Sequence, residues 1–396
     1  KTEKVAQGLV RWPSPSYGVG VAIVGPMPSI IQLLRTIATT CATFSVFFYE
    51  GFAYNRIFLG RILPAADKED FVLPFAICFN TALGLAFWSY LRARLEDPGK
   101  VPPRWQEFVG SVGDLLPIAP ARLEWQPGKA TYCNQCGVPR PERAHHCRIC
   151  GVCVLRMDHH CPWLSNCVGF KNHKYFLLAV GYGLLSSTVA VITSLPELVA
   201  CFDMFIRMQE GQPLKNRWHL RIVDVSMFLA FGLVAVVLTM LLSTMLAAHL
   251  ELGAHNATSI EGHYDNMPNP FDQGTAMSNL AQLMGEFGLD WFLPITPWKP
   301  LTDGVSYERT DERIIGPGGN QLRNHWSSEP VEKLWRIRYR VRQPMVQEQM
   351  SERLGSIRAW WGGPCADKEP LVSRGSPRGA MEYQRDSSGR RYIIAL

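Results

Sequence analysis

The sequence has little charge for its length and no strong excess of either sign. Of its 396 residues, 19% are charged, and the formal net charge is +6. A nucleic-acid-binding domain usually carries a much stronger excess of Lys and Arg, so we expect no nucleic-acid partner. We find no internal repeat, which excludes a repeat array for binding substrates. No short apolar stretch with a small-residue cleavage site lies near the start, and we expect no signal peptide.

Cysteine is sparse over most of the chain and concentrated in one segment. Seven of the eleven cysteines fall between Cys133 and Cys167, and the other four stand alone at positions 41, 78, 201 and 365. Small secreted disulfide scaffolds are rich in cysteine throughout, so the sequence does not fit that class. CxxC pairs recur within the segment, which favours zinc binding in a reducing compartment.

Charge is absent from three long apolar runs, and a fourth run has a single charge. The uncharged runs are Phe71–Leu91, Tyr175–Leu195 and Ser226–Ala248, and the fourth, Ser29–Tyr49, contains Arg35. A membrane-spanning helix needs roughly 20 apolar residues, and an arginine near a helix end can reach the lipid headgroups. Three uncharged runs of this length are rare among the core helices of soluble proteins, so we predict four transmembrane helices.

The spans divide the chain into six predicted parts. These are a cytosolic N-terminal segment (1–28), spans 1 and 2 (29–91), a cysteine-rich zinc domain (92–174), spans 3 and 4 (175–248), a cytosolic segment with an amphipathic helix (249–307) and a C-terminal tail (308–396). Thiols stay reduced in the cytosol, which indicates that the cysteine-rich domain faces that compartment. Four spans then place both termini on the same side, although the basic residues beside the spans support this orientation only in part.

The cysteine-rich segment has one thiol more than two zinc sites need. Structural zinc sites take four Cys or His ligands, so six cysteines and two histidines would supply two sites. The count does not by itself identify the seventh cysteine. Cys161 is the best candidate because it alone follows an Asp-His-His run, Asp158 to His160. An imidazole can take a thiol proton while a carboxylate orients the imidazole, and the thiolate is the reactive form.

These residues resemble the DHHC protein S-acyltransferases, a family of membrane enzymes that palmitoylate cysteines. The resemblance covers roughly residues 30 to 290. The matching motifs are Asp97–Gly99 (DPG), Pro139–Cys147 (PxRxHHC, here with an extra residue), Asp158–Cys161 (DHHC), Cys161–Gly169 (CPWxxNCVG), Asn172–Phe176 (NxxxF), Thr258–Glu261 (TTxE, here with Ser in the second place) and Asn269–Asn279 (the C-terminal motif).

The resemblance implies a fold and a division of roles. The fold would be an all-α membrane protein, a four-helix transmembrane bundle with a cytosolic, zinc-bound cysteine-rich domain of small strands and loops between spans 2 and 3. Two structural zinc ions would be held by two alternating ligand sets: Cys133, Cys136, His146 and Cys153, and Cys147, Cys150, His160 and Cys167. His145 could replace His146 as a ligand. Cys161 would be the nucleophile, His159 the base, and Asp158 the residue that orients His159.

The resemblance also implies an activity. A long-chain fatty acyl group would pass from acyl-CoA to Cys161 and then to cysteines of membrane-associated substrate proteins, in a ping-pong exchange of thioesters. The enzyme would be a multi-pass protein of the endomembrane system, in the Golgi, the endoplasmic reticulum or the plasma membrane. The alternative is a catalytically inactive, membrane-anchored zinc domain that acts as a scaffold or accessory subunit.

Several further residues are candidates for supporting roles. Trp163 is two residues past Cys161 and is placed to shape the mouth of an acyl-chain cavity. Four basic residues could bind the CoA phosphates or, equally, anionic lipid headgroups. These are Arg148, Arg156, Lys171 and Lys174. The residues that match the structural motifs of the family are Thr258, Glu261, Asn269 and Asn279.

Two segments near the C-terminus have recognisable patterns. Apolar residues recur at helical spacing from Met277 to Phe287, which predicts an amphipathic helix docked on the bundle or the membrane surface. Leu334–Arg342 alternates arginine with apolar residues, which predicts a strand or a membrane-lying basic segment. The rest of the tail is rich in Gly, Ser, Pro and charge and is predicted to be disordered.

Overall fold

A computed structural model describes residues 30–210, 220–310 and 331–341, and the backbone of residues 383–385 and 391–393. By its internal contacts the chain divides into two units, Lys1–Arg342 and Gln343–Leu396. The described part of the second unit is an antiparallel pair of short strands, β8 (Tyr383–Arg385) and β9 (Arg391–Ile393). All other described elements belong to the first unit.

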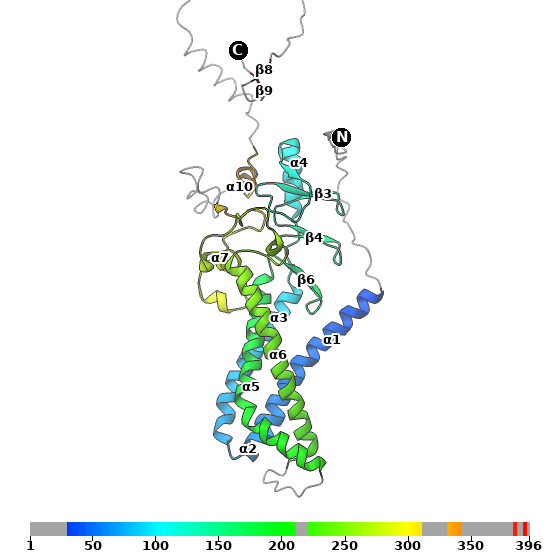
Figure 1. Cartoon of the computed structure of the whole chain (residues 1–396), viewed down its shortest axis with the longest axis vertical. Coiled ribbons are helices and arrows are strands. Elements are labelled where there is room, and N and C mark those ends of the chain that lie inside the picture. Colours follow the sequence, from blue (N-terminus) through cyan, green and yellow to red (C-terminus); the bar gives the residue numbers. More distant parts are fainter. Residues whose placement is uncertain (1–29, 211–219, 311–330, 342–382, 386–390, 394–396) are drawn as a thin grey trace, which may run out of the picture. The chain divides into compact units, whose positions relative to one another are not determined.

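The first unit has four long helical segments, the first of which slants away from the other three toward its N-terminal end (Figure 1). They are α1 (Ile30–Phe52) with its continuation through η1 (Ala53–Ile62) and α2 (Leu63–Ala65), α3 (Val72–Leu95), α5 (His173–Gln209) and α6 (Ile222–Ala254). Each is long and apolar enough to cross a membrane. The sequence prediction of four candidate membrane helices is therefore confirmed, and every helix extends beyond the apolar run from which it was predicted.

Aromatic side chains fill the end of the bundle that is remote from the cysteine-rich segment. Tyr54 and Phe79 stack with ring centroids 3.8 Å apart, and Phe58 stacks on Phe228 at 5.5 Å. Tyr54 and Phe58 lie in η1, a π-helix of ten residues, and both side chains are fully buried. Aromatic rings bury large apolar areas, so this cluster holds the four segments together at that end.

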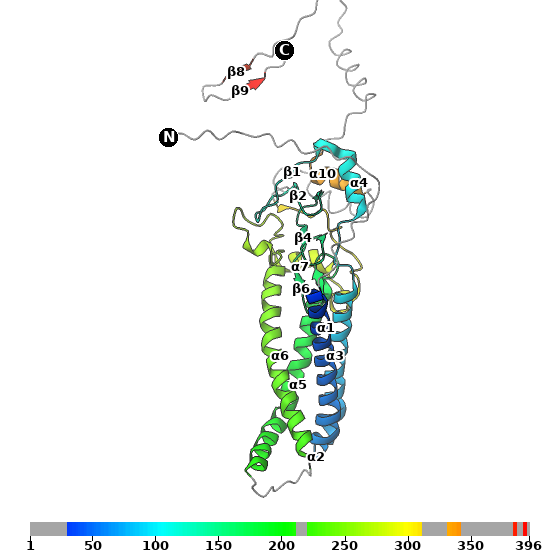
Figure 2. The same cartoon turned by 90° about the vertical axis from the view of Figure 1, so that its right-hand side faces the viewer.

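The cysteine-rich segment between α3 and α5 contains seven short strands. They are β1 (Ile118–Ala119), β2 (Ala130–Cys133), β3 (Val138–Arg140), β4 (His145–Cys147), β5 (Val152–Val154), β6 (His159–Cys161) and β7 (Asn166–Val168). Three successive antiparallel hairpins result, β2–β3, β4–β5 and β6–β7, and β1 joins the first as a parallel edge. The β6 hairpin is the nearest of the three to the helices in both views (Figure 2). The predicted domain of small strands and loops is thus present between the second and third helices.

The basic segment near residue 334 is helical, so the prediction of a strand there is wrong, while the alternative of a membrane-lying basic segment stays a prediction. Helix α10 (Val331–Arg338) buries Leu334 and Trp335, and the Trp335 ring lies 5.5 Å from Trp105 of helix α4 (Pro103–Val112). Arginine and apolar residues alternate with a period of two in the sequence, but the buried residues recur with the period of a helix. Trp335 packs against Trp105, which is more than 200 residues away in the sequence. Arg342 and most of the tail predicted to be disordered lie outside the described residues.

The predicted amphipathic helix after the fourth span is confirmed as α7 (Ala276–Met284). The Thr275 hydroxyl caps its first turn by accepting a hydrogen bond from the Ser278 amide at 3.1 Å. The helix ends at Gly285, which has a positive φ of 88° that favours glycine, so Phe287 lies beyond it. Leu283 and Met284 pack in the same apolar cluster as Cys161, so α7 closes the bundle beside the cysteine-rich segment.

Candidate active site and metal centres

Two CxxC turns each present a pair of sulfur atoms. In the first, the Cys136 amide donates to Cys133 Sγ at 3.4 Å, and the Gly137 amide donates to the Cys133 carbonyl at 2.8 Å. Cys147, Cys150 and Gly151 repeat this geometry with the same two distances. The glycine in each turn has a φ of +68°, which a side chain disfavours. The sequence CxxCG therefore folds locally into a turn that brings two thiols together.

The strand register supplies the other two ligands of each group. Across the β4–β5 hairpin His146 is paired with Cys153, and across the β6–β7 hairpin His160 is paired with Cys167. Residues paired across an antiparallel hairpin have their Cβ atoms about 5 Å apart on the same face. Each CxxC turn thus faces the His–Cys pair of the hairpin that follows it.

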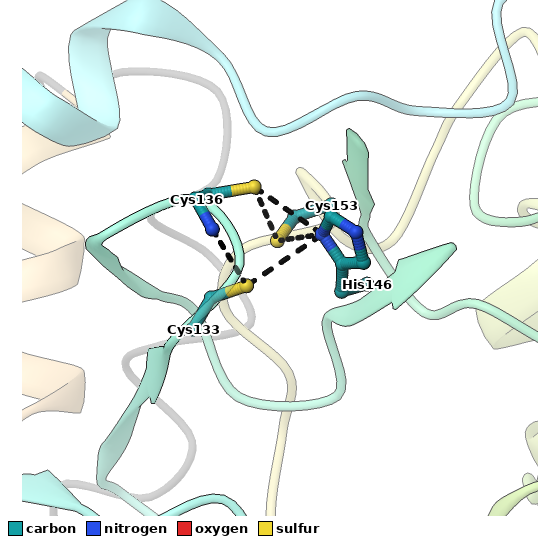
Figure 3. Close-up of side chains that lie close together, drawn as sticks. All are labelled: Cys133, Cys136, His146 and Cys153. Atoms are coloured by element: carbon teal, nitrogen blue, oxygen red, sulfur yellow. Dashed lines mark hydrogen bonds between the residues drawn. The ribbon is translucent and has the colours of Figure 1, made fainter. Parts of the chain in front are cut away.

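The first group consists of Cys133, Cys136, His146 and Cys153 (Figure 3). His146 Nδ1 lies 3.6 Å from Cys133 Sγ, 3.2 Å from Cys136 Sγ and 3.8 Å from Cys153 Sγ. The sulfurs of Cys136 and Cys153 are 3.7 Å apart. Zinc with bonds of about 2.0 to 2.3 Å in a tetrahedron requires ligand atoms about 3.3 to 3.8 Å apart, so this group fits the ion.

The second group consists of Cys147, Cys150, His160 and Cys167. His160 Nδ1 lies 3.7 Å from Cys147 Sγ, 3.4 Å from Cys150 Sγ and 3.7 Å from Cys167 Sγ. Both Cys3His groups could therefore hold a metal ion, and they contain the eight residues that the family resemblance implied. His145 belongs to neither group, and its Nε2 atom is buried without a hydrogen-bond partner.

Cys161 lies outside both groups, on the other face of strand β6. Alternate residues of a strand point to opposite faces, so His160 turns toward the second metal group while His159 and Cys161 share the other face. Cys161 is buried in an apolar cluster that includes Tyr90 and Leu164. Of the seven cysteines between Cys133 and Cys167, it is the one that no metal group uses.

Asp158 is fully buried and surrounded by hydrogen-bond donors. Its Oδ2 atom accepts from His159 Nδ1 at 2.6 Å and from the Ser259 hydroxyl at 2.9 Å, and its Oδ1 atom accepts from the Ser259 amide at 2.8 Å. Burial raises the pKa of Asp158, but the hydrogen bonds from His159 and from the Ser259 amide outweigh it and hold the pKa well below its usual range. The carboxylate is therefore ionised and fixed, and it orients the His159 ring.

His159 and Cys161 favour each other's charged forms. Burial lowers the pKa of His159, but the hydrogen bond with Asp158 and the interaction with Cys161 raise it to about 9. Burial raises the pKa of the Cys161 thiol, but the interaction with His159 and the amides of Leu164 and Trp163 bring it below its usual value. An imidazolium beside a thiolate is the arrangement expected of a reactive cysteine. The His159 side chain is 31% exposed, whereas Cys161 is 5% exposed, so solvent reaches the imidazole and not the thiol.

A buried ion pair joins the cysteine-rich segment to the segment after α6. Arg143 donates from Nε and Nη2 to the two carboxylate oxygens of Glu261, both at 2.7 Å. Burial raises the pKa of Glu261, but the charge of Arg143 outweighs this and lowers it below its usual range. Glu261 also accepts from the Thr258 amide at 3.0 Å, and Ser259 contacts Asp158 directly. The TTxE-like motif thus holds the orienting carboxylate in place.

Two residues of this site were not predicted as site residues from the sequence. Ser259 supplies both an amide and a hydroxyl to Asp158. His249, on the last turns of α6, has its Nδ1 atom 3.9 Å from Asp158 Oδ2. Only a family pattern could have pointed to Ser259, because more than 80 residues of bundle separate both residues from Asp158 in the sequence.

The four candidate basic residues fall into two pairs. Arg148 and Lys171 are exposed. Arg156 is 1% exposed and donates to Asn256 Oδ1 at 3.2 Å, while Lys174 is 2% exposed and lies 3.8 Å from Asp290. The buried pair is therefore committed to internal contacts, and only the exposed pair has the access that a CoA phosphate needs.

The other predicted residues lie around the site. Trp163 is 58% exposed beside Cys161. Asn279 donates to the Ala254 carbonyl at 2.7 Å and accepts from the Gln273 amide at 2.6 Å, which ties α7 to the end of α6. Asn269 donates to the His255 carbonyl. The two asparagines therefore stabilise the segment that carries Ser259 and Glu261.

The sequence is similar to those of known proteins. A family model described as DHHC palmitoyltransferase matches residues 126–265. The chain is 35% identical over 220 residues to "Probable protein S-acyltransferase 12" of Arabidopsis thaliana, covering 55% of this chain and 71% of that protein. It is 33% identical over 256 residues to "Probable protein S-acyltransferase 13" of the same plant (62% and 81%), and 34% identical over 307 residues to "Palmitoyltransferase ZDHHC2" of Rattus norvegicus (76% and 72%).

These similarities, together with four membrane-length helices and two Cys3His groups, define a class of enzymes that transfer acyl groups to protein cysteines. The chain belongs to the DHHC palmitoyltransferase family and is a protein S-acyltransferase.

Proposed function

We propose that Cys161 is the nucleophile that carries the acyl group, with His159 as its general base and Asp158 as the residue that orients His159. The observation that carries this proposal is the position of Cys161. It lies outside both metal groups and on the same strand face as His159, whose Nδ1 atom donates to Asp158. The other six cysteines of the segment each have a place in a metal group.

The reaction consists of two thioester exchanges. In the first, the Cys161 thiolate attacks the carbonyl carbon of an acyl-CoA thioester, the carbon–sulfur bond to CoA breaks, and the CoA sulfur takes a proton from the His159 imidazolium. In the second, His159 takes the proton of a substrate cysteine, whose sulfur attacks the acyl carbon and releases Cys161 as a thiolate. Thioester is exchanged for thioester in both steps, so the reaction needs no other energy source.

Zinc is the ion that best suits the two Cys3His groups. Thiolate and imidazole ligands with separations of 3.2 to 3.8 Å match tetrahedral zinc. Each group supplies four protein ligands, which leaves no position for water, so a bound ion would stabilise the fold. It would hold the CxxC turns against the hairpins and thereby fix the β6 strand that carries His159 and Cys161.

Insertion of the four long helices in a membrane would explain where the acyl chain lies. Cys161 faces an apolar cluster that includes Phe176 and Val180 of α5. A palmitoyl tail has about fifteen methylenes, and each favours an apolar environment by roughly 0.8 kcal/mol. A thiol at the boundary between bundle and cytosol would let the tail remain among the helices. The cysteine-rich domain would then lie on the cytosolic side of a membrane of the endomembrane system. The substrates would be long-chain acyl-CoA and membrane-associated proteins with accessible cysteines.

The decisive experiment is labelling with a clickable palmitoyl-CoA analogue. The purified full chain should acquire a hydroxylamine-labile label that is absent from Cys161→Ser. Cys41→Ser is a matched control, because Cys41 is exposed on α1 and outside both metal groups, and it should keep the label. Cys161→Ser should also keep both zinc ions, which would separate loss of the nucleophile from loss of a ligand.

Two results would contradict the proposal. A label that persists in Cys161→Ser would assign the nucleophile elsewhere. A wild-type chain that holds two zinc ions but takes no label from acyl-CoAs of any length would support a scaffold or accessory subunit instead.

A further inference from the structure

His249 is a second imidazole beside the Asp158–His159 pair, contributed by helix α6. Its Nδ1 atom lies 3.9 Å from Asp158 Oδ2, the same oxygen that accepts from His159 Nδ1. The three ligand-type atoms of Asp158, His159 and His249 all lie within 4.8 Å of one another. The His249 side chain is only 14% exposed, so it is a constituent of the site and not a surface group.

The rings around His249 restrict both its own position and that of His159. The His249 ring meets Phe176 edge-on at 4.9 Å, and it lies 5.7 Å from the His159 ring at an interplanar angle of 35°. Phe176 also contacts His159, at 5.3 Å. His159 is therefore enclosed by Phe176 and His249, while Asp158 holds its Nδ1 atom. Side chains locked by packing keep reacting groups in productive geometry.

Packing alone does not account for a histidine at this position. An apolar residue would pack against Phe176 equally well, whereas His249 turns a nitrogen toward a fully buried carboxylate. The donors of Asp158 come from two directions, His159 on β6 and Ser259 after α6. His249 adds a third polar neighbour on α6 itself, so it links the membrane helix directly to the orienting carboxylate.

We propose that His249 is a positioning residue for acyl transfer. It keeps the Asp158 carboxylate and the His159 ring in the orientation from which His159 meets Cys161. This inference rests on the proposed roles of Cys161, His159 and Asp158. It adds a residue of the fourth helix to the catalytic arrangement, so that the end of α6 and the β6 hairpin must be correctly placed together for the thiol to react.

Three substitutions separate a positioning role from packing. Asn places its amide nitrogen where Nδ1 of histidine lies, whereas Gln places its amide where Nε2 lies, away from Asp158. Leu fills the space without a polar atom. If the Nδ1 position matters, His249→Asn should recover most of the rate, and His249→Gln and His249→Leu should not. His255→Leu is the matched control, because His255 is 68% exposed near the same helix end.

The measurement is single-turnover formation of acyl-Cys161 by the full chain in nanodiscs, over a range of palmitoyl-CoA concentrations, with zinc content determined for every variant. We expect His249→Leu and His249→Gln to lower the maximal rate by about ten- to a hundredfold, and His249→Asn by less than about threefold. The half-saturating concentration of palmitoyl-CoA and the two zinc ions should be unchanged, and His255→Leu should behave as wild type.

Several outcomes would overturn the inference. Equal rates for Asn, Gln and Leu at position 249 would show that the nitrogen is irrelevant, whether all are fast or all are slow. A change in half-saturation alone would assign His249 to acyl-CoA binding. Failure of the proposed function has a different signature, because wild type would then carry no label on Cys161 at all.

Discussion

Arg143 and Glu261, which are 118 residues apart in the sequence, form a two-pronged ion pair in which each side chain is only 1% exposed. The pair connects the loop before β4 with the TTxE-like segment, and Asn256 also accepts from Arg143 at 3.2 Å. Burying two charges is costly unless each is fully paired, so the two segments are held together as long as both partners remain.

Removal of one partner of this pair should destabilise the protein strongly. Arg143→Ala leaves a buried, unpaired carboxylate, and we expect a loss of about 3–5 kcal/mol in the free energy of unfolding. The matched control is Glu286→Gln, which breaks the exposed pair with Lys299 (56% and 75% exposed) and should cost less than about 1 kcal/mol. Thermal and denaturant unfolding of both variants in detergent measure the difference. Similar losses in the two variants would contradict the structural role of Arg143.

The pH dependence of the pair follows from the pKa of Glu261. Arg143 holds that pKa below its ordinary value of 4.5, so Glu261 is already ionised throughout the range from pH 5.5 to 8. A carboxyl with a lowered pKa stabilises the fold above its unfolded pKa, and the stability is lost only as the pH falls through the folded value. The melting-temperature gap between wild type and Glu261→Gln should therefore be constant from pH 8 to 5.5. A gap that shrinks as the pH falls over this range would mean that burial outweighs the charge of Arg143 and raises the pKa of Glu261.

Loss of the orienting carboxylate should slow acylation without loss of metal. Asp158→Asn preserves the shape of the side chain but removes the charge that fixes His159, and we expect self-acylation of Cys161 to fall by about a hundredfold or more. Zinc content should stay at the wild-type level because Asp158 is in neither Cys3His group. An Asp158→Asn variant with the wild-type rate would remove Asp158 from the mechanism.

Each metal group should account for one zinc ion. Cys136→Ser removes a ligand of the first group and Cys150→Ser a ligand of the second, so each variant should hold one ion in place of two. Chelation of both ions should unfold the hairpins and abolish activity, since metal binding and folding are coupled in such domains. Metal analysis of the purified variants is the test, with Cys41→Ser as the control. A retained second ion in either variant would show that the grouping of ligands is wrong.

The α10 helix should contribute to stability through Trp335. This side chain is 3% exposed against Trp105 and Phe108, so Trp335→Ala should cost about 3–5 kcal/mol. Ile337 is 51% exposed on the same helix, and Ile337→Ala should change stability by less than about 0.5 kcal/mol. Denaturant unfolding that shows the same effect for both would indicate that α10 does not pack on α4 in solution.

The sequence by itself was sufficient to predict the four candidate membrane helices, the number of candidate metal ligands and the surplus thiol. Uncharged apolar runs of about 20 residues are rare outside membrane-spanning helices, and CxxCG turns are local structures whose geometry depends on adjacent residues. The proposed catalytic run Asp158–Cys161 also lies in one short stretch, so its chemistry could be proposed before any contact was known. The division of the ligands into two groups, in contrast, came from a family resemblance and not from their spacing.

The tertiary structure decided which residues meet. Strand register pairs His146 with Cys153, and strand alternation separates His160 from Cys161. Ser259 and His249 reach Asp158 from the end of α6, Arg156 is buried with Asn256, and the segment near residue 334 becomes a helix because Trp105 offers it an apolar face. The contacts of Ser259, His249, Asn256 and Trp105 depend on packing between segments more than 80 residues apart, and no local pattern of charge or hydrophobicity specifies them.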